Sequence, residues 1–273
     1  MDIPESVTTI GEGAFAACSN LKEFTGKYAA DGGRCLIIDN TIIAYANASG
    51  TTYNIPDSVT TIGYWAFIGC DSLTSVTIGG SVTTIGEGAF AGCSNLREFT
   101  GKYAADGGRC LIIDNTIIAY AEASGTTYNI PESVTTIGDW AFAWCISLTS
   151  VNIPDSVTTI GDDAFLGCGS LTSVNIPENV TTIGNSAFFS CDSLTSVNIP
   201  ENVTIIGNQA FDYCTSLKYV YCKATTPPAL GYSNVFDNNA SRRRIIVPIG
   251  SGEAYKTAEN WSGYANDIFE DVF

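Results

Sequence analysis

The chain is built from a repeated stretch of 23 residues, which constrains its fold more than any other feature. The stretch "IPENVTTIGNSAFFSCDSLTSVN" covers residues 176–198, and "IPENVTIIGNQAFDYCTSLKYVY" follows it directly. Repeats of this length are typical of solenoids, in which stacked turns bury one continuous core. One cysteine marks the same position in seven copies: Cys18, Cys70, Cys93, Cys145, Cys168, Cys191 and Cys214.

Two of the gaps between these cysteines are 52 residues long instead of 23, because a longer module of 29 residues is inserted. This module reads "GKYAADGGRCLIIDNTIIAYANASGTTYN", and its second copy begins at Gly101. In addition, residues 11–46 match residues 86–121 at all but two positions. A chain that gains whole turns by duplication behaves as a solenoid and not as a closed globule.

Apolar residues occupy fixed positions within each module, and their spacing predicts the course of one turn. The segment "LTSVNIP" has the L-x-x-L-x-L spacing, and its alternation of apolar and polar residues predicts a half-buried strand. "VTTI" predicts a second short extended segment, and the glycine after it predicts a change of direction of the chain. "NSAFFSC" predicts a single helical turn. We therefore expect a β-rich, leucine-rich-repeat-like solenoid of about ten turns of 23 or 29 residues, with short strands and helical turns.

The repeat also predicts how the chain is divided. Residues 1–222 form the solenoid, and residues 223–273 form a degenerate last turn and a C-terminal cap. The chain begins within a repeat, so we expect the solenoid to be incomplete at its N-terminal edge. Strand groups left unpaired at that edge favour self-association.

The C-terminal cap is predicted from "SGEAYKTAENW", which can form a short helix. Ser251 is the expected N-cap of this helix. Gly252 stands where a bulkier residue would pack better, which predicts a loose cap. The residues expected to face inward are Tyr255, Ala258 and Trp261.

The composition excludes several classes of function. The net charge is -16, from 12 basic and 28 acidic residues, which disfavours binding to nucleic acid and to anionic membranes. The absence of histidine excludes Ser-His-Asp catalysis and histidine-bound zinc. The chain contains no run of 18 apolar residues, so no membrane-spanning segment is predicted. Its first residues, "MDIPESVTTIG", have no basic start and no apolar run, so we expect no export signal in them. We expect no cofactor, no metal and no catalytic residue.

The pattern I-P-x-x-V-T-x-I-G-x-x-A-F-x-x-C-x-x-L-x-x-V resembles the BspA-like leucine-rich repeat proteins of bacteria. The long module and the tail "YCKATTPPAL…IIVP…EAYKTAENW" are similar to that family as well, so the resemblance covers essentially the whole chain. It implies a leucine-rich-repeat-like solenoid that is secreted or displayed on a cell surface. It also implies adhesion to host or microbial partners, and it brings no catalytic residues with it.

Three sets of repeated residues have a structural and a functional interpretation. The seven aligned cysteines fit a reduced, buried column better than disulfides or a metal site. Trp65 and Trp140 each follow a long module, so they are expected to pack against its extra residues; a sugar-stacking platform with Trp144 is the alternative. Acidic residues at two repeat positions are expected to be solvated corners, although a cation could bridge them: Glu5, Asp57, Glu132, Asp155, Glu178 and Glu201 at one, and Glu12, Glu87, Asp139 and Asp162 at the other.

Polar residues of the predicted strands form the candidate binding face. They repeat on one exposed surface, which is either an ordinary solvated sheet surface or a place for many weak hydrogen bonds to a partner. Two tyrosines break the repeat near its C-terminal end, and tyrosine provides a large contact area at low entropic cost. The candidate residues are Thr149, Ser150, Asn152, Thr172, Ser173, Asn175, Thr195, Ser196, Asn198, Tyr219 and Tyr221.

These observations favour a non-enzymatic surface or secreted repeat protein that binds an extracellular protein or a glycan. A passive spacer that presents another domain is the second hypothesis, and uniform turns favour it. An enzyme acting on carbohydrate is the third hypothesis. Its catalytic residues would have to come from the non-repeated tail, which offers only Asp237, Arg242 to Arg244 and Glu253.

Overall fold

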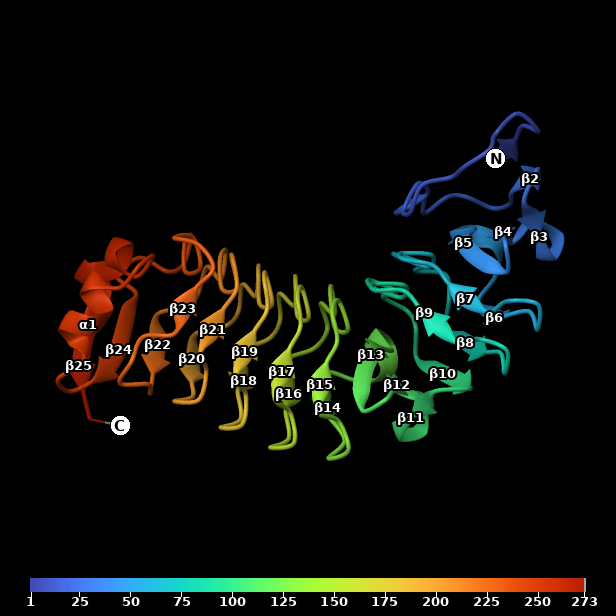
Figure 1. Cartoon of the computed structure of the whole chain (residues 1–273). Helices are drawn as coiled ribbons and strands as arrows, with labels where there is room; N and C mark the ends of the chain where they lie inside the picture. Colours follow the sequence, from blue (N-terminus) through green and yellow to red (C-terminus); the bar gives the residue numbers. More distant parts are fainter. Residues whose placement is uncertain (273) are drawn as a thin grey trace. The chain divides into compact units, whose positions relative to one another are not determined.

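The fold is a β-solenoid, which a computed structural model describes for residues 1–272. The chain divides into two compact units, Met1–Ser124 and Gly125–Phe273, and each unit is a coil of stacked turns (Figure 1). There are about twelve turns, counting β1 in the incomplete first turn and β25, which the repeat pattern did not predict. The predicted division at residue 222 stays a prediction.

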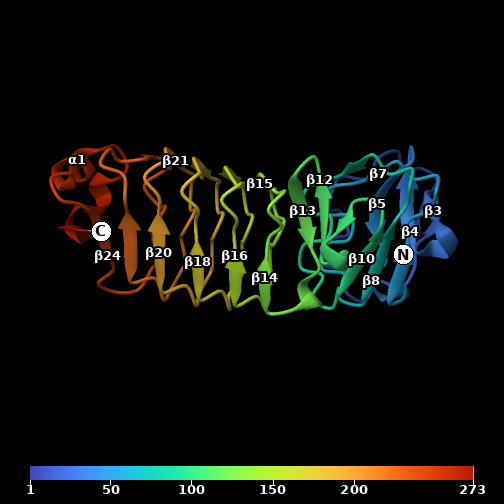
Figure 2. The same ribbon diagram turned by 90° about the horizontal axis from the view of Figure 1, so that it is seen from below.

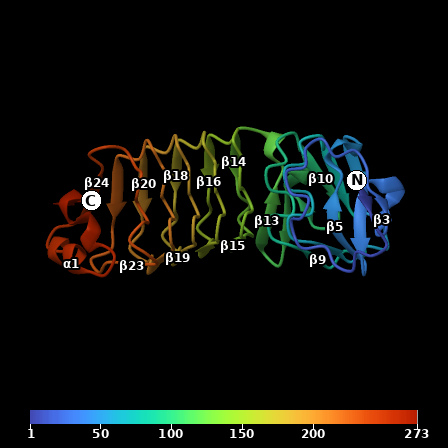
Figure 3. The ribbon, with the colours of Figure 1, turned by 90° about the horizontal axis from the view of Figure 1, so that it is seen from above.

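In the second unit five turns contribute one strand to each of two parallel sheets, and the last two turns extend only the first sheet. Figures 2 and 3 show the strands of each sheet side by side along the coil. Neighbouring strands pair in register one repeat apart, for example Val151 with Val174 and Ile160 with Ile183. The first sheet contains β14 (Thr127–Asn129), β16 (Ser150–Asn152), β18 (Ser173–Asn175), β20 (Ser196–Ile199), β22 (Tyr219–Cys222), β24 (Arg244–Pro248) and β25 (Ile268–Asp271). The second contains β15 (Thr136–Ile137), β17 (Thr159–Ile160), β19 (Thr182–Ile183), β21 (Ile205–Ile206) and β23 (Ala229–Leu230).

A third side of each turn is the segment that the sequence predicts as a helical turn. It is a run of single turns, because residues with positive φ interrupt it, such as Ser186 (φ 49°) and Ser190 (φ 55°). Its amides bond to the next turn: the Phe165 N–H donates to Ala187 O at 2.8 Å, and the Phe188 N–H to Ala210 O at 2.8 Å. The third side therefore adds its own row of hydrogen bonds between turns.

The core of the second unit is a stack of phenylalanines, one from each turn. Ring centroids are 5.1 Å apart both between Phe165 and Phe188 and between Phe188 and Phe211, with planes only 5° apart. The aligned cysteines lie beside this stack and donate to it. Cys191 Sγ is 3.3 Å from Phe165 O, and Cys214 Sγ is 3.1 Å from Phe188 O. The aligned cysteines thus pack as apolar side chains in the core, and their thiols donate weak hydrogen bonds to carbonyl groups of the preceding turn.

The first unit follows the same plan but inserts a hairpin in each long module. β5 pairs antiparallel with β4 and parallel with β7, so the hairpin belongs to a five-stranded sheet of the first unit, in the order β3-β4-β5-β7-β9. Tyr45 replaces the missing phenylalanine, with its ring stacked 5.0 Å from Phe67. The elements are β1 (Asp2–Ile3), β2 (Thr25–Gly26), β3 (Ala29–Ala30), η1 (Asp31–Gly33), β4 (Cys35–Ile38), β5 (Thr41–Tyr45), η2 (Asn47–Ser49), β6 (Thr52–Asn54), β7 (Thr61–Ile62), β8 (Ser75–Ile78), β9 (Thr84–Ile85), β10 (Glu98–Gly101), β11 (Ala104–Ala105), η3 (Asp106–Gly108), β12 (Cys110–Ile113), β13 (Thr116–Tyr120) and η4 (Glu122–Ser124).

The first turn is less well buried than the later ones. Phe15 is half-buried and Cys18 is exposed, whereas their equivalents Phe188 and Cys191 are fully buried. The indole of Trp65 reaches across to Gly13, where an added Cβ would meet Trp65 Cε3 at 2.7 Å.

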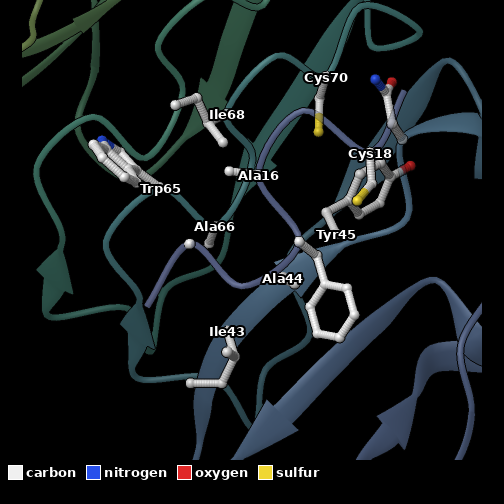
Figure 4. Close-up of a pocket in the computed structure, with 12 residues that line it drawn as sticks. Ala16, Cys18, Ile43, Ala44, Tyr45, Trp65, Ala66, Ile68 and Cys70 are labelled. Carbon is white, nitrogen blue, oxygen red and sulfur yellow. The ribbon is translucent and has the colours of Figure 1, made fainter. Parts of the chain in front are cut away.

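Figure 4 shows Trp65 at the edge of a cavity that Ile43 and Ala44 of β5 also line. The cavity has a volume of ≈ 10 Å³, which is room for about one water molecule and not for a ligand. Trp65 therefore has a packing role beside the long module, in line with the structural interpretation.

The C-terminal cap consists of α1 (Gly252–Thr257) and η5 (Ser262–Asp267), and it buries Tyr255 and Trp261. Ser251 is the N-cap residue of α1, as predicted, but its hydroxyl makes no capping bond to the helix and donates to Pro248 O at 2.6 Å instead. The prediction that a bulkier residue would pack better at Gly252 is wrong. The Gly252 N–H donates to Glu270 Oε1 at 2.6 Å, and a Cβ there would lie 2.6 Å from the same oxygen. None of the helices within residues 1–272 is long and apolar enough to cross a membrane.

The glycine after "TTI" has a different role from the predicted change of direction. A Cβ on Gly184 would lie 2.5 Å from Gly161 C and 2.6 Å from Asp162 N, both in the preceding turn. Glycine is needed here because the backbones of successive turns touch.

We predict that Gly184→Ala lowers the free energy of unfolding by roughly 1–3 kcal/mol, because the methyl group pushes two turns apart. The midpoint of urea unfolding measures this. Gly169→Ala is the matched control, because no atom lies within 4 Å of the added Cβ. Equal midpoints for the two variants would show that the turns do not need this contact.

We predict that Cys18 alone reacts with a maleimide in the native protein, and that all ten cysteines react as free thiols after unfolding without reductant. The other nine are buried, and burial raises the pKa of the Cys93 thiol to about 12, so it stays protonated as well as covered. Mass spectrometry counts the labels, with Cys18→Ser as control. Missing labels after unfolding would reveal disulfides and overturn the prediction.

Candidate functional site

The predicted binding residues lie on β16, β18, β20 and β22 and on the residue before each of the first three strands. We call these eleven residues, 149–150, 152, 172–173, 175, 195–196, 198, 219 and 221, the ladder face. The middle residues of the strands, such as Val174 and Val197, are buried, so their neighbours point outward. Figure 2 shows these strands side by side.

Two of the three threonines of the ladder face bond to the preceding turn. The Thr149 hydroxyl donates to Thr126 O at 2.9 Å, and the Thr172 hydroxyl to Thr149 O at 3.1 Å. These two donors are therefore already occupied by the backbone of the preceding turn. The interpretation of the threonines as donors to a partner is not supported by this geometry.

The asparagines behave differently. Asn152, Asn175 and Asn198 pair in register on successive strands, and all three side chains are exposed. Within residues 1–272 their amide groups have no hydrogen-bond partner in the chain. They form a row of free donors and acceptors, repeated at about the 4.8 Å spacing of neighbouring strands.

The row of asparagines continues into apolar residues at its C-terminal end. Asn198 pairs in register with Tyr221, Tyr221 with Ile246, and Ile246 with Phe269. We call this series the asparagine column: Asn152, Asn175, Asn198, Tyr221, Ile246 and Phe269. One row of the sheet thus changes from amides to apolar side chains along its length.

A second row runs beside it and ends on an arginine. Ser196 pairs with Tyr219, which is 42% exposed, and Tyr219 pairs with Arg244. The Tyr219 and Tyr221 rings lie 6.2 Å apart, with planes at 22°. The structure therefore brings the predicted tyrosines together with three residues that the sequence analysis did not include in the binding face. Those residues, Arg244, Ile246 and Phe269, lie outside the regular repeat, and the alternation in "RRRIIVP" was the one signal for the first two.

The tryptophan alternative is not favoured by the geometry. Trp140 and Trp144 lie 5.3 Å apart, but their planes meet at 58°, so they form no flat platform. Trp144 covers Gly167 in the next turn, where an added Cβ would lie 2.6 Å from its Cδ1. Both residues belong to the turn segment and not to the ladder face.

At one of the two acidic positions, Asp139 and Asp162 are not the solvated corners that the sequence predicted, whereas Glu12 and Glu87 are exposed. Asp139 Oδ1 accepts the Asp162 N–H at 2.7 Å, and Asp162 Oδ1 accepts the Asn185 N–H at 2.7 Å. Asn185 Oδ1 then accepts the Asn208 N–H at 2.8 Å. These side chains form a further row of bonds between turns. Among the described residues no group of three or more Cys, Asp or Glu side chains is placed to hold a metal ion.

The acidic and basic residues of the tail contact residues of the cap or face solvent. Asp237 Oδ1 accepts the Tyr264 hydroxyl at 3.1 Å, and Arg243 pairs with Asp267 at 2.6 Å and lies 4.9 Å from the Tyr264 ring. Glu253 is exposed on α1. Their arrangement supports packing of the cap rather than a shared reaction.

The stacked turns and the exposed strand row define a leucine-rich-repeat solenoid, and the comparisons identify its family. The BspA type leucine rich repeat region matches residues 1–32, 37–104 and 115–242 in six copies. The chain belongs to this family. No curated protein matches the chain.

Several solved structures are similar. A leucine rich cell surface protein from Faecalibacterium prausnitzii is 26% identical, with a TM-score of 0.67, over 95% of this chain and 81% of that one. The pneumococcal vaccine antigen PcpA is 18% identical, with a TM-score of 0.55, over 100% and 67%. A leucine-rich repeat protein from Eubacterium ventriosum is 20% identical, with a TM-score of 0.50, over 88% and 82%. The last two show the fold alone.

We predict that Asp163→Asn stabilises the protein at pH 7 and above by about 0.5 kcal/mol. Burial, with the charges of Asp162 and Asp139, raises the pKa of Asp163 to about 6. Because this folded-state pKa exceeds the unfolded value, the carboxyl destabilises the fold progressively as pH rises from about 4 to about 6. The side chain is partly exposed, so the expected effect is small.

Thermal unfolding at pH 4 and pH 8 measures this effect. Glu201→Gln is the control, because it removes the same charge from an exposed position. The gain of Asp163→Asn over this control should be present at pH 8 and absent below about pH 4. A gain that is the same at both pH values would contradict the prediction.

Proposed function

We propose that this chain is a non-enzymatic repeat protein, secreted or displayed on a cell surface, that binds an extracellular protein or glycan in adhesion to host or microbial partners. The observation that carries the proposal is the asparagine column. Its three exposed amides lack partners within the described chain, and it continues into Tyr221, Ile246 and Phe269. Free hydrogen-bonding groups beside apolar anchors suit a macromolecular ligand.

Two further points support it. The chain belongs to the BspA-type repeat family, and the similar protein from Faecalibacterium prausnitzii is described as a cell surface protein. In addition, two of the three threonines, Thr149 and Thr172, are committed to bonds between turns, whereas none of the three asparagines is. A surface with only a structural role gives no reason for a row of free amides.

A passive spacer is the second candidate function. The near-identical turns between residues 130 and 221 support it, because a spacer needs length and stiffness and no special site. The non-repeated aromatics at the end of the ladder face favour binding over a spacer.

The proposal is tested by a binding screen against host matrix proteins and glycans, followed by Tyr219→Ala with Tyr221→Ala. We expect the double change to weaken binding by roughly ten- to a hundredfold, because aromatic anchors dominate such interfaces. Charge insertion by Asn175→Glu with Asn198→Glu should also weaken it. Binding that survives all four changes would place the site elsewhere, and the absence of any ligand in the screen would favour the spacer.

A further inference from the structure

Three consecutive arginines, Arg242 to Arg244, end in different environments. Arg243 is turned inward, with a side chain only 9% exposed. Its Nη2 lies 2.6 Å from Asp267 Oδ2, and its guanidinium is 4.9 Å from the centre of the Tyr264 ring. Arg243 therefore fixes the cap, and its charge is neutralised inside the protein.

Arg244 faces outward on the sheet. It stands next to Tyr219 in the strand register, and its guanidinium lies 4.2 Å above the ring of Phe269. Phe269 is 40% exposed, so arginine and ring form one surface feature. A guanidinium stacked on an aromatic ring is held in place and keeps its donors free for a second partner.

Arg242 is exposed on the loop before β24, with φ 64°. No carboxylate among residues 1–272 lies within ion-pair distance of either Arg242 or Arg244. These two arginines line a groove of ≈ 370 Å³ together with Arg243, Asn266, Asp267 and Phe269. We call it the arginine groove. The one carboxylate in its lining, that of Asp267, is already paired with Arg243.

The charge of the groove contrasts with that of the whole protein. The chain carries a net charge of -16, yet this groove presents two unpaired cations, and Lys218 is exposed on the residue before β22. Unpaired cations on an acidic protein are complementary to an anionic partner. Guanidinium groups bind carboxylates with two parallel hydrogen bonds, which gives direction as well as charge.

The apolar end of the asparagine column borders the groove, because Phe269 belongs to both. A ligand on this surface therefore meets cations and apolar side chains side by side. A polyanion of high charge density uses only the cations, and the overall negative charge repels it. A polypeptide that combines carboxylates with apolar side chains uses both parts of the surface.

We infer that the arginine groove binds the carboxylates of an acidic, extended polypeptide, whose apolar side chains lie on Tyr221, Ile246 and Phe269. This inference rests on the proposed function, since it names the chemistry of a partner for the same face. Arg242 and Arg244 hold the carboxylates, and Phe269 orients Arg244.

The test measures the fluorescence anisotropy of a short labelled peptide that alternates glutamate with phenylalanine and serine. We expect Arg242→Gln with Arg244→Gln to weaken its binding at least tenfold, which corresponds to about 1.4 kcal/mol. Binding should also weaken as salt is added. Arg243 is left unchanged because the cap depends on it, and thermal unfolding verifies that the variants fold.

Two controls test whether binding depends on these arginines and on the carboxylates of the peptide. Lys22→Gln with Arg97→Gln removes the same charge from exposed positions of the first unit and should leave binding unchanged. The same peptide with glutamine for glutamate should not bind. Peptide binding that survives the loss of both arginines overturns the inference, as does arginine-dependent binding of heparin without binding of the peptide.

The charge insertions at Asn175 and Asn198 separate this inference from the proposed function. If a ligand from the screen depends on those asparagines while the acidic peptide fails to bind, the inference is wrong and the proposed function stands. If the peptide depends on the arginines while no ligand depends on the asparagines or tyrosines, the site is the groove alone and the ladder face is not the binding surface.

Discussion

Backbone contact between successive turns is the constraint on which the rest of this structure depends. At Gly184 the backbones approach so closely that a single methyl group does not fit. This spacing lets all three sides of a turn bond to the next one, as in the bonds that Phe165 and Phe188 make one repeat further on. A turn has no complete set of partners of its own, so the turns are stable only as a stack.

Side chains that repeat in every turn serve mainly this stacking. Cys191 donates to a carbonyl of the preceding turn, Thr172 does the same at the sheet, and Asp162 accepts from the following turn. In the sequence these residues resemble functional sites, because polar and nucleophilic side chains recur at the same position of every repeat. In the structure they bond to backbone groups of the adjacent turns. Few polar side chains are therefore left to bind a partner.

The side chains available to a binding partner are those that do not bond to a neighbouring turn. The amides of Asn152, Asn175 and Asn198 have no partner among the described residues, and the C-terminal turns replace polar residues of the sheet with aromatic and apolar ones. There Arg243 turns inward to neutralise Asp267, while Arg244 stays outside on Phe269. The sheet surface is therefore uniform in its middle and carries aromatic, apolar and arginine side chains at its C-terminal end. A binding partner can make the most varied contacts at that end.

The sequence by itself determined whatever is the same in every turn. A residue such as Val174 or Phe188 contacts copies of itself, so its burial and register follow from the period alone. The tertiary structure decided what depends on unlike neighbours: the strand β25, the role of Gly252 and the different environments of Arg243 and Arg244. It also separated the threonines from the asparagines of the candidate site. The period cannot show this, because whether a polar group is free depends on its distance to a backbone in the next turn.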